Sequence, residues 1–126
     1  MLVIDDEPSI CELFARALVT SGFFPVVANN AEMALRVING GVNPDAILLD
    51  LLMPGMGGLG FLLQIRADPQ RSHIPVAIVT ANSLIPSSVH YTARALRAEI
   101  HFKPLEVDAI LTLTERLVES ANNPAT

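Results

Sequence analysis

Acidic residues stand at two places in this chain where an apolar stretch comes to an end. Asp5 and Asp6 follow the short apolar start of the chain, and Asp50 follows the apolar residues 46–49. If these two segments are neighbours, each close pair of carboxylates repels by about 4 kcal/mol at an effective dielectric of 20. Such a cluster either holds protons or binds a cation. A site with three oxygen donors and room for water favours Mg²⁺ over Ca²⁺, because Ca²⁺ prefers a cage with more protein ligands.

A hydroxyl and a lysine end two further apolar stretches. Thr80 follows residues 76–79, and Lys103, the only lysine in the chain, follows residues 100–102. A lysine and a divalent cation neutralise phosphoryl oxygens, and a hydroxyl donates to one of them. A carboxylate such as that of Asp50 can then act as a nucleophile and form an acyl phosphate. Taken alone, each residue has an ordinary structural explanation; together they favour phosphoryl-transfer chemistry.

The elements that must position these side chains are five short apolar stretches. They are rich in Val and Ile and mostly continuous, which is typical of parallel strands covered on both faces. Their ranges are 2–4, 24–28, 46–49, 76–79 and 100–102. Because ligands of open parallel sheets bind at the carboxyl ends of the strands, the polar residues that follow each stretch are the candidate site.

Helical periodicity separates the five stretches. Ser9 is the expected N-cap of a first helix that ends at Gly22, and Asn30 caps a second that ends at Gly40. A third helix is expected from about residue 59 to the residues before 69, a fourth over 87–96, and a fifth after 104. Strands that alternate with helices in this way predict a single α/β domain, a doubly wound five-stranded parallel sheet.

Composition narrows the class of protein. The chain has 126 residues, 51% hydrophobic and 17% charged, which describes one globular domain. A net charge of −5 argues against direct binding of nucleic acid. We find no apolar run of about 18 residues and no basic N-terminal segment, so neither a membrane span nor a signal peptide is expected. A single cysteine fits a cytoplasmic location. Met1 stands directly before the first strand, which is compatible with a start trimmed upstream or with a genuinely short one.

Four motifs together resemble the response-regulator receiver domain of two-component signalling. They are the acidic pair at residues 5 and 6, LLDLLMPGMGG around Asp50, VTA at Thr80 and FKP at Lys103. The resemblance covers nearly the whole chain, and each motif follows a predicted strand. It implies a flavodoxin-like (βα)5 fold with strand order 2-1-3-4-5, a receiver domain over residues 1–121, and a polar tail over 122–126.

The resemblance also assigns roles around the acceptor. Asp50 would take a phosphoryl group from a phosphohistidine of a sensor histidine kinase or a phosphotransfer protein. Asp6, Asp50 and the backbone carbonyl of Leu52 would bind Mg²⁺ directly, and Asp5 would support the ion mostly through water. Because Leu52 is apolar and lies two residues beyond the acceptor, we expect a long-lived phosphoryl state.

Thr80 and Lys103 would both contact the phosphoryl group, and Thr80 would move inward on activation. The Lys103–Pro104 peptide bond is expected to be cis, as is usual in the family and feasible because the second residue is proline. Pro54 and Gly58 fit the loop that follows the acceptor in the family.

The chain departs from the family's pattern at positions in and just before the last strand. The family usually has Tyr or Phe three residues before the lysine, where this chain has Ile100. Coupling to an output surface would then be weaker, or would use another side chain such as His101 or Tyr91. The glycine–alanine pair common before the last strand is replaced by Arg97-Ala98.

The resemblance favours a phosphorylation-controlled switch and not an enzyme, with two alternatives left open. The first is a receiver-like interaction domain that acts constitutively, with vestigial phosphorylation. The second is a Mg²⁺-dependent phosphohydrolase that uses an aspartyl phosphate. Residues 51–53 are Leu, Leu and Met, so no general acid follows Asp50, and the chain has no inserted cap. Both observations count against the hydrolase.

The expected partners are a sensor kinase or phosphotransfer protein and a downstream protein or effector domain that the sequence does not identify. No direct contact with nucleic acid or membrane is expected. A homodimer through the last two helices is a further option. It is suggested by basic and acidic side chains on those helices: Arg94, Arg97, Glu106, Asp108 and Glu115. A solvated helix surface explains the same charges.

Overall fold

Five parallel strands and five helices alternate along the chain. The computed structural model describes residues 1–53, 55–81 and 85–122, with the side chains of 121 and 122 left aside. The strands are β1 (Leu2–Ile4), β2 (Val26–Ala28), β3 (Ile47–Leu49), β4 (Val76–Thr80) and β5 (Ala98–Phe102). The helices are α1 (Pro8–Thr20), α2 (Ala31–Asn39), α3 (Gly57–Ala67), α4 (Ser87–Ala95) and α5 (Val107–Asn122). The predicted α/β class is confirmed, and residues 123–126 of the expected tail lie outside the described residues.

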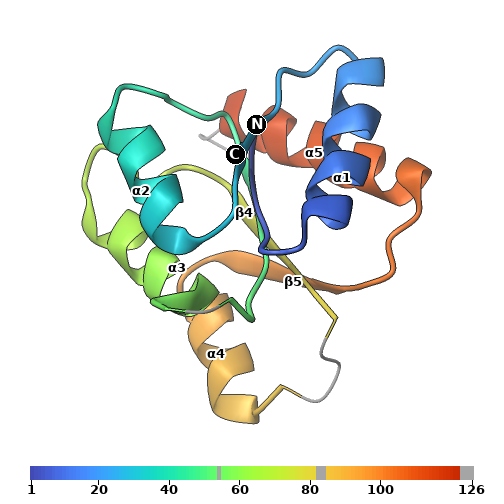
Figure 1. Cartoon of the computed structure of the whole chain (residues 1–126). Helices are drawn as coiled ribbons and strands as arrows, with labels where there is room; N and C mark the ends of the chain where they lie inside the picture. Colours follow the sequence, from blue (N-terminus) through green and yellow to red (C-terminus); the bar gives the residue numbers. More distant parts are fainter. Residues whose placement is uncertain (54, 82–84, 123–126) are drawn as a thin grey trace.

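The strands form one sheet in the order β2-β1-β3-β4-β5, as the resemblance implied. Figure 1 shows α1 and α5 on one face of this sheet and α2, α3 and α4 on the other. Ile4 of β1 is paired with Leu49 of β3, so the residues after both strands emerge side by side. The register therefore brings Asp5 and Asp50 to the same edge.

Each face of the sheet has its own hydrophobic core. Phe61 and Leu62 of α3 are fully buried on the face that α2, α3 and α4 cover. Phe14 and Leu18 of α1 are buried on the other face, together with residues of α5. Because both faces are covered, β1, β3 and β4 are buried throughout, which explains their continuous apolar sequences, whereas the edge strands β2 and β5 are only partly buried. No helix in the described part of the chain is long and apolar enough to cross a bilayer.

The start of α1 differs from the prediction. Ser9 is inside the helix, and the N-cap is Glu7, whose side chain makes no capping hydrogen bond. The Asp5 carboxylate instead accepts a hydrogen bond from the Glu7 amide at 3.0 Å, and Pro8 supplies the first helical residue. A proline at this position has its φ angle already set for a helix, so the helix begins there and not after Ser9.

The prediction for α2 is confirmed. Asn30 is the N-cap, and its side chain accepts a hydrogen bond from the amide of Met33 at 2.7 Å. An Asn at this position satisfies one of the four amides that a helix start leaves without a partner.

Three other boundaries shift by a few residues. β2 begins at Val26 instead of Phe24, because Phe24 is exposed and Pro25 has no amide to donate. β5 begins at Ala98 instead of 100, because it pairs with β4 from Val76 onward. The third helix begins at Gly57, two residues earlier than its apolar periodicity indicated.

Candidate functional site

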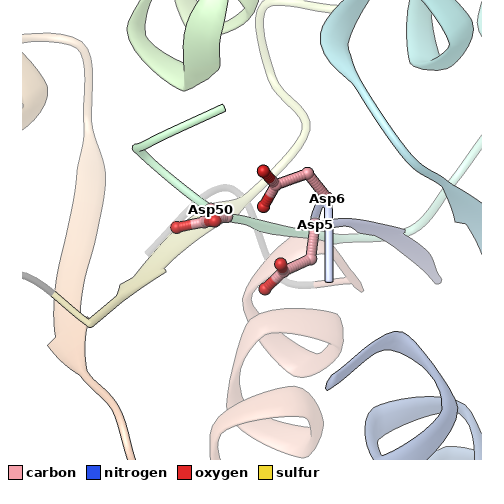
Figure 2. Close-up of side chains that lie close together, drawn as sticks. All are labelled: Asp5, Asp6 and Asp50. Atoms are coloured by element: carbon pink, nitrogen blue, oxygen red, sulfur yellow. The ribbon is translucent and has the colours of Figure 1, made fainter. Parts of the chain in front are cut away.

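Three carboxylates gather at the carboxyl ends of β1 and β3. Asp5 and Asp6 follow β1, and Asp50 follows β3 (Figure 2). One oxygen of each lies within 4.8 Å of the others. Asp5 and Asp50 are buried, at 2% and 6% exposure, whereas Asp6 is exposed. The structure thus brings together all three acids that the sequence predicted to share a site.

Lys103 reaches the same cluster from the end of β5. Its Nζ lies 2.6 Å from an oxygen of Asp5 and 3.9 Å from an oxygen of Asp50. Its backbone amide donates to the carbonyl of Thr80 at 2.8 Å, and its peptide bond to Pro104 is cis, as expected. Burial lowers the pKa of Lys103, but the hydrogen bond to Asp5 and the nearby acids raise it above its usual value overall. The amine is therefore charged at neutral pH.

Asp50 is the most strongly perturbed acid of the cluster. Burial, followed by the negative charge of Asp5, raises its pKa to about 6, although Lys103 opposes the shift. The amide of Leu52 also donates to the Asp50 carboxylate, at 3.4 Å. A carboxylate that is buried and repelled by a neighbour gains strongly from a bound cation.

The donor set fits a magnesium ion. The cluster offers only carboxylate oxygens, carries more negative charge than Lys103 neutralises, and has one exposed member, Asp6. Asp5 already accepts hydrogen bonds from Lys103 and from the Glu7 amide, so its oxygens are partly occupied. This chemistry is that of a hard cation that keeps part of its water shell.

Among the remaining predicted residues, Thr80 and Leu52 lie at the same edge of the sheet, and the switch candidates lie on β5 and α4. Thr80 is fully buried at the end of β4, which lies between β3 and β5. The Leu52 side chain is exposed beside the acceptor. Ile100 packs against the core on the face that α3 and α4 cover. Among the other two switch candidates, His101 lies near Glu99, with Nε2 3.9 Å from its carboxylate, and the Tyr91 side chain is exposed on α4.

Gly58 allows α3 to approach the acceptor closely. A Cβ atom at this position would lie 2.2 Å from the Asp50 carbonyl oxygen and 2.9 Å from the Cα of Leu51. No side chain fits there, so glycine is required for α3 to begin directly against the end of β3. Pro54, the other loop residue in the resemblance, lies outside the described residues.

Two supporting contacts were not predicted from the sequence. Glu32, in the first turn of α2, accepts a hydrogen bond from the Met56 amide at 2.9 Å, which ties α2 to the loop after Asp50. Cys11, predicted to be buried, donates from Sγ to the Asp5 carbonyl at 3.2 Å. Both contacts form only when the chain is folded, and no local sequence motif marks the partners.

Residues 1–115 match the family model described as the response regulator receiver domain. The DNA-binding response regulator MtrA of Mycolicibacterium smegmatis is 36% identical over 83 residues, which are 66% of this chain and 35% of MtrA. The regulatory protein AtoC of Escherichia coli is 28% identical over 94% of this chain and 25% of its own length. The matched residues therefore span about a third of MtrA and a quarter of AtoC.

Solved structures share the fold. The receiver domain of NtrX from Brucella abortus is 30% identical, with a TM-score of 0.83 over 94% of this chain and 98% of that domain. A CheY-like receiver domain protein from Methanospirillum hungatei superposes with a TM-score of 0.89 over 98% of this chain and 96% of that protein. At 18% identity, this second similarity concerns the fold alone.

Proposed function

Since this chain belongs to the response regulator receiver domains of two-component systems, whose general function is a phosphorylation switch, we propose that Asp50 is its phosphoacceptor. The donor is a phosphohistidine of a sensor histidine kinase or a phosphotransfer protein. The observation that carries the proposal is the position of the Asp50 carboxylate, between two further acids and 3.9 Å from the amine of Lys103. As in the family, the chain acts as a signalling switch and not as a classical enzyme.

The transfer exchanges one bond at phosphorus for another. An oxygen of the Asp50 carboxylate attacks phosphorus, the bond between phosphorus and the histidine nitrogen breaks, and the imidazole keeps that electron pair and takes up a proton. The Lys103 amine neutralises a phosphoryl oxygen, and the Thr80 hydroxyl donates to another. Lys103 leaves its close contact with Asp5 to do this, and the Asp5 carboxylate is then available to the metal site.

The residues that would hold Mg²⁺ are Asp5, Asp6, Asp50 and the backbone carbonyl of Leu52. Asp6 and Asp50 would bind the ion directly with the carbonyl of Leu52, and Asp5 would support it mostly through water. When bound, the ion neutralises charge on the phosphoryl oxygens. The proposal is supported by the three clustered carboxylates and by the raised pKa of Asp50.

The wider setting is also proposed. Residues 1–121 act as the receiver unit and 122–126 as a polar tail, in the cytoplasm, with no direct contact to nucleic acid. MtrA is named a DNA-binding regulator, but the similarity covers only 35% of it. An output carried by a separate segment or partner protein is compatible with the net charge of −5 on this chain. A homodimer through α4 and α5 is a further proposal.

Phosphorylation by a small donor tests the acceptor directly. The wild type, Asp50→Asn and Asp45→Asn are incubated with acetyl phosphate and Mg²⁺, and intact mass is followed with time. Asp45 is an exposed acid before β3, at the opposite end of that strand from Asp50, so its variant removes the same charge. We expect one phosphoryl group per chain in the wild type and Asp45→Asn, none in Asp50→Asn, and none in any protein with EDTA.

The alternatives give different results. No labelling of the wild type would support a constitutive interaction domain. Continuous release of phosphate with little covalent label would support a Mg²⁺-dependent phosphohydrolase. Labelling that persists in Asp50→Asn would contradict the acceptor assignment. A second incubation with a phosphorylated histidine kinase then tests the donor separately from the acceptor.

A further inference from the structure

One arginine adopts a backbone conformation that side chains disfavour. Arg97, between α4 and β5, has a φ angle of +60°, the only positive value among the non-glycine residues that the structure describes. The left-handed region brings Cβ too close to the following carbonyl, so an L-residue there is strained. Strain of this kind persists only where the surrounding structure enforces it, and it concentrates at functional positions.

The side chain of Arg97 lies next to a second guanidinium. Arg66, from α3, donates to the carbonyls of Leu96 at 2.7 Å and Ile74 at 2.7 Å, and to that of Ser72 at 2.9 Å. Arg97 donates to the same Ser72 carbonyl, also at 2.9 Å. Two like charges therefore share one neutral acceptor. Burial, and then the charge of Arg97, lowers the pKa of Arg66 to about 10.

Arg66 already ties these segments together, so the fold does not require the second guanidinium. Arg97 adds backbone strain and like-charge repulsion at a point where Arg66 satisfies three carbonyls. An arrangement with both penalties becomes favourable when an anion binds between the cations.

Both guanidiniums line a hollow of about 280 Å³ at the start of β4 and β5. The site with Asp50 lies at the opposite ends of these strands, so the hollow is separate from it. Its charged lining consists of Arg66, Arg97, Arg116 and Glu99, with His73 beside them. Glu99 is paired with Arg116, so among the described residues that line the hollow Arg66 and Arg97 have no carboxylate partner, in a chain whose net charge is −5.

We propose that this hollow is an anion site for the phosphate group, either as inorganic phosphate or as the end of a small phosphomonoester. The two positive charges of Arg66 and Arg97 match a ligand with two negative charges better than they match a ligand with a single carboxylate. Guanidinium N–H donors fit phosphate oxygens, and Arg97 has Nε and Nη1 beside the Nη2 that serves Ser72. Arg66 already uses Nε and Nη1 on carbonyls, so it offers the anion its charge and a donor on Nη2. In bound form, the anion bridges Arg97 and Arg66 and receives a third contact from Arg116.

The test is an NMR titration of the ¹⁵N-labelled protein with sodium phosphate in EDTA, at constant ionic strength maintained with sodium chloride. EDTA keeps metal away from Asp50. We expect saturable shifts of the backbone amides of Ser72, His73 and Arg97, and no such shifts with chloride alone. A parallel titration with glycerol 3-phosphate distinguishes the source: equal or tighter binding indicates a phosphomonoester, and weaker binding indicates inorganic phosphate.

Variants separate the site from general charge effects. Arg97→Gly removes the guanidinium and keeps the backbone, because glycine adopts a φ of +60° freely, and it should weaken phosphate binding at least about tenfold. Arg116→Gln changes an exposed side chain and should also weaken phosphate binding. Arg36→Gln removes one charge from α2, which packs on β2 and β1 at the opposite edge of the sheet from β5, and should leave binding unchanged. Shifts that do not saturate, or an Arg97→Gly protein that binds as the wild type does, would overturn the proposal.

Discussion

At the scale of single residues, the acceptor carboxylate is held in an unfavourable state. Folding raises the pKa of Asp50 from 3.8 to about 6. Between these values the folded protein binds more protons than the unfolded chain, so the free energy of unfolding falls as pH rises through this window. For the metal-free protein we expect a loss of up to about 3 kcal/mol between about pH 4 and pH 6. Urea denaturation in EDTA at a series of pH values measures this loss in the free energy of unfolding.

Asp50→Asn is the control for this pH dependence. An amide has no charge to bury, so the free energy of unfolding of the variant should depend much less on pH in this window. The variant should also be more stable than the wild type near neutral pH. Added Mg²⁺ should stabilise the wild type and not the variant. An identical pH profile for the two proteins would show that another group causes the fall.

Asp5 and Asp6 are adjacent but differ in what they contact. Asp6 is exposed, so Asp6→Asn should weaken Mg²⁺ binding at least roughly tenfold with little change in stability. Asp5 is the 2.6 Å partner of the nearly buried amine of Lys103, so Asp5→Asn should lower stability by about 3 kcal/mol. Calorimetric titration with Mg²⁺ and urea denaturation measure the two effects. If Asp5→Asn weakens Mg²⁺ binding more than Asp6→Asn does, the division of roles is reversed.

At the scale of elements, the start of α3 is fitted to the end of β3. Gly58→Ala would place a methyl group 2.2 Å from the Asp50 carbonyl oxygen, so the backbone of the acceptor must move. We expect a loss of about 2–3 kcal/mol in stability and slower labelling by acetyl phosphate. Chemical denaturation and intact mass give the two readouts.

Gly60→Ala is the matched control on the same helix. The three atoms nearest to its Cβ would belong to the flexible side chain of Met56, and alanine favours the helix, so stability should stay within about 1 kcal/mol of the wild type. Equal behaviour of the Gly58 and Gly60 variants would mean that the close approach of α3 does not matter.

Elements were predictable where local sequence determines them. Short, mostly continuous apolar stretches identified all five strands, and Asn30 marked the start of α2 correctly. The predicted N-cap at Ser9 was wrong because a proline and an acidic turn before it compete for the start of the helix. The residues that gather at the sheet edge were predictable because parallel strands end at the same side.

At the scale of the whole molecule, the fold is also held by contacts that no motif marks. Arg66 reaches from α3 to the residues before β4 and to the end of α4, and Glu32 reaches from α2 to the loop after Asp50. Both residues fall within predicted helices, and no motif around them marks a partner. Their partners are backbone groups 6 to 30 residues away, which only the folded chain brings within reach.

Arg66 therefore supplies a test of how these segments are held together. Arg66→Met keeps the length of the side chain but leaves the carbonyls of Leu96, Ser72 and Ile74 without this donor, which should cost about 3 kcal/mol or more. Arg16→Gln breaks an exposed pair with Glu12 on α1 and should cost about 0.5 kcal/mol or less. Urea denaturation compares the two. A small effect of Arg66→Met would mean that water satisfies these carbonyls, and that Arg66 lies there for the anion and not for the fold.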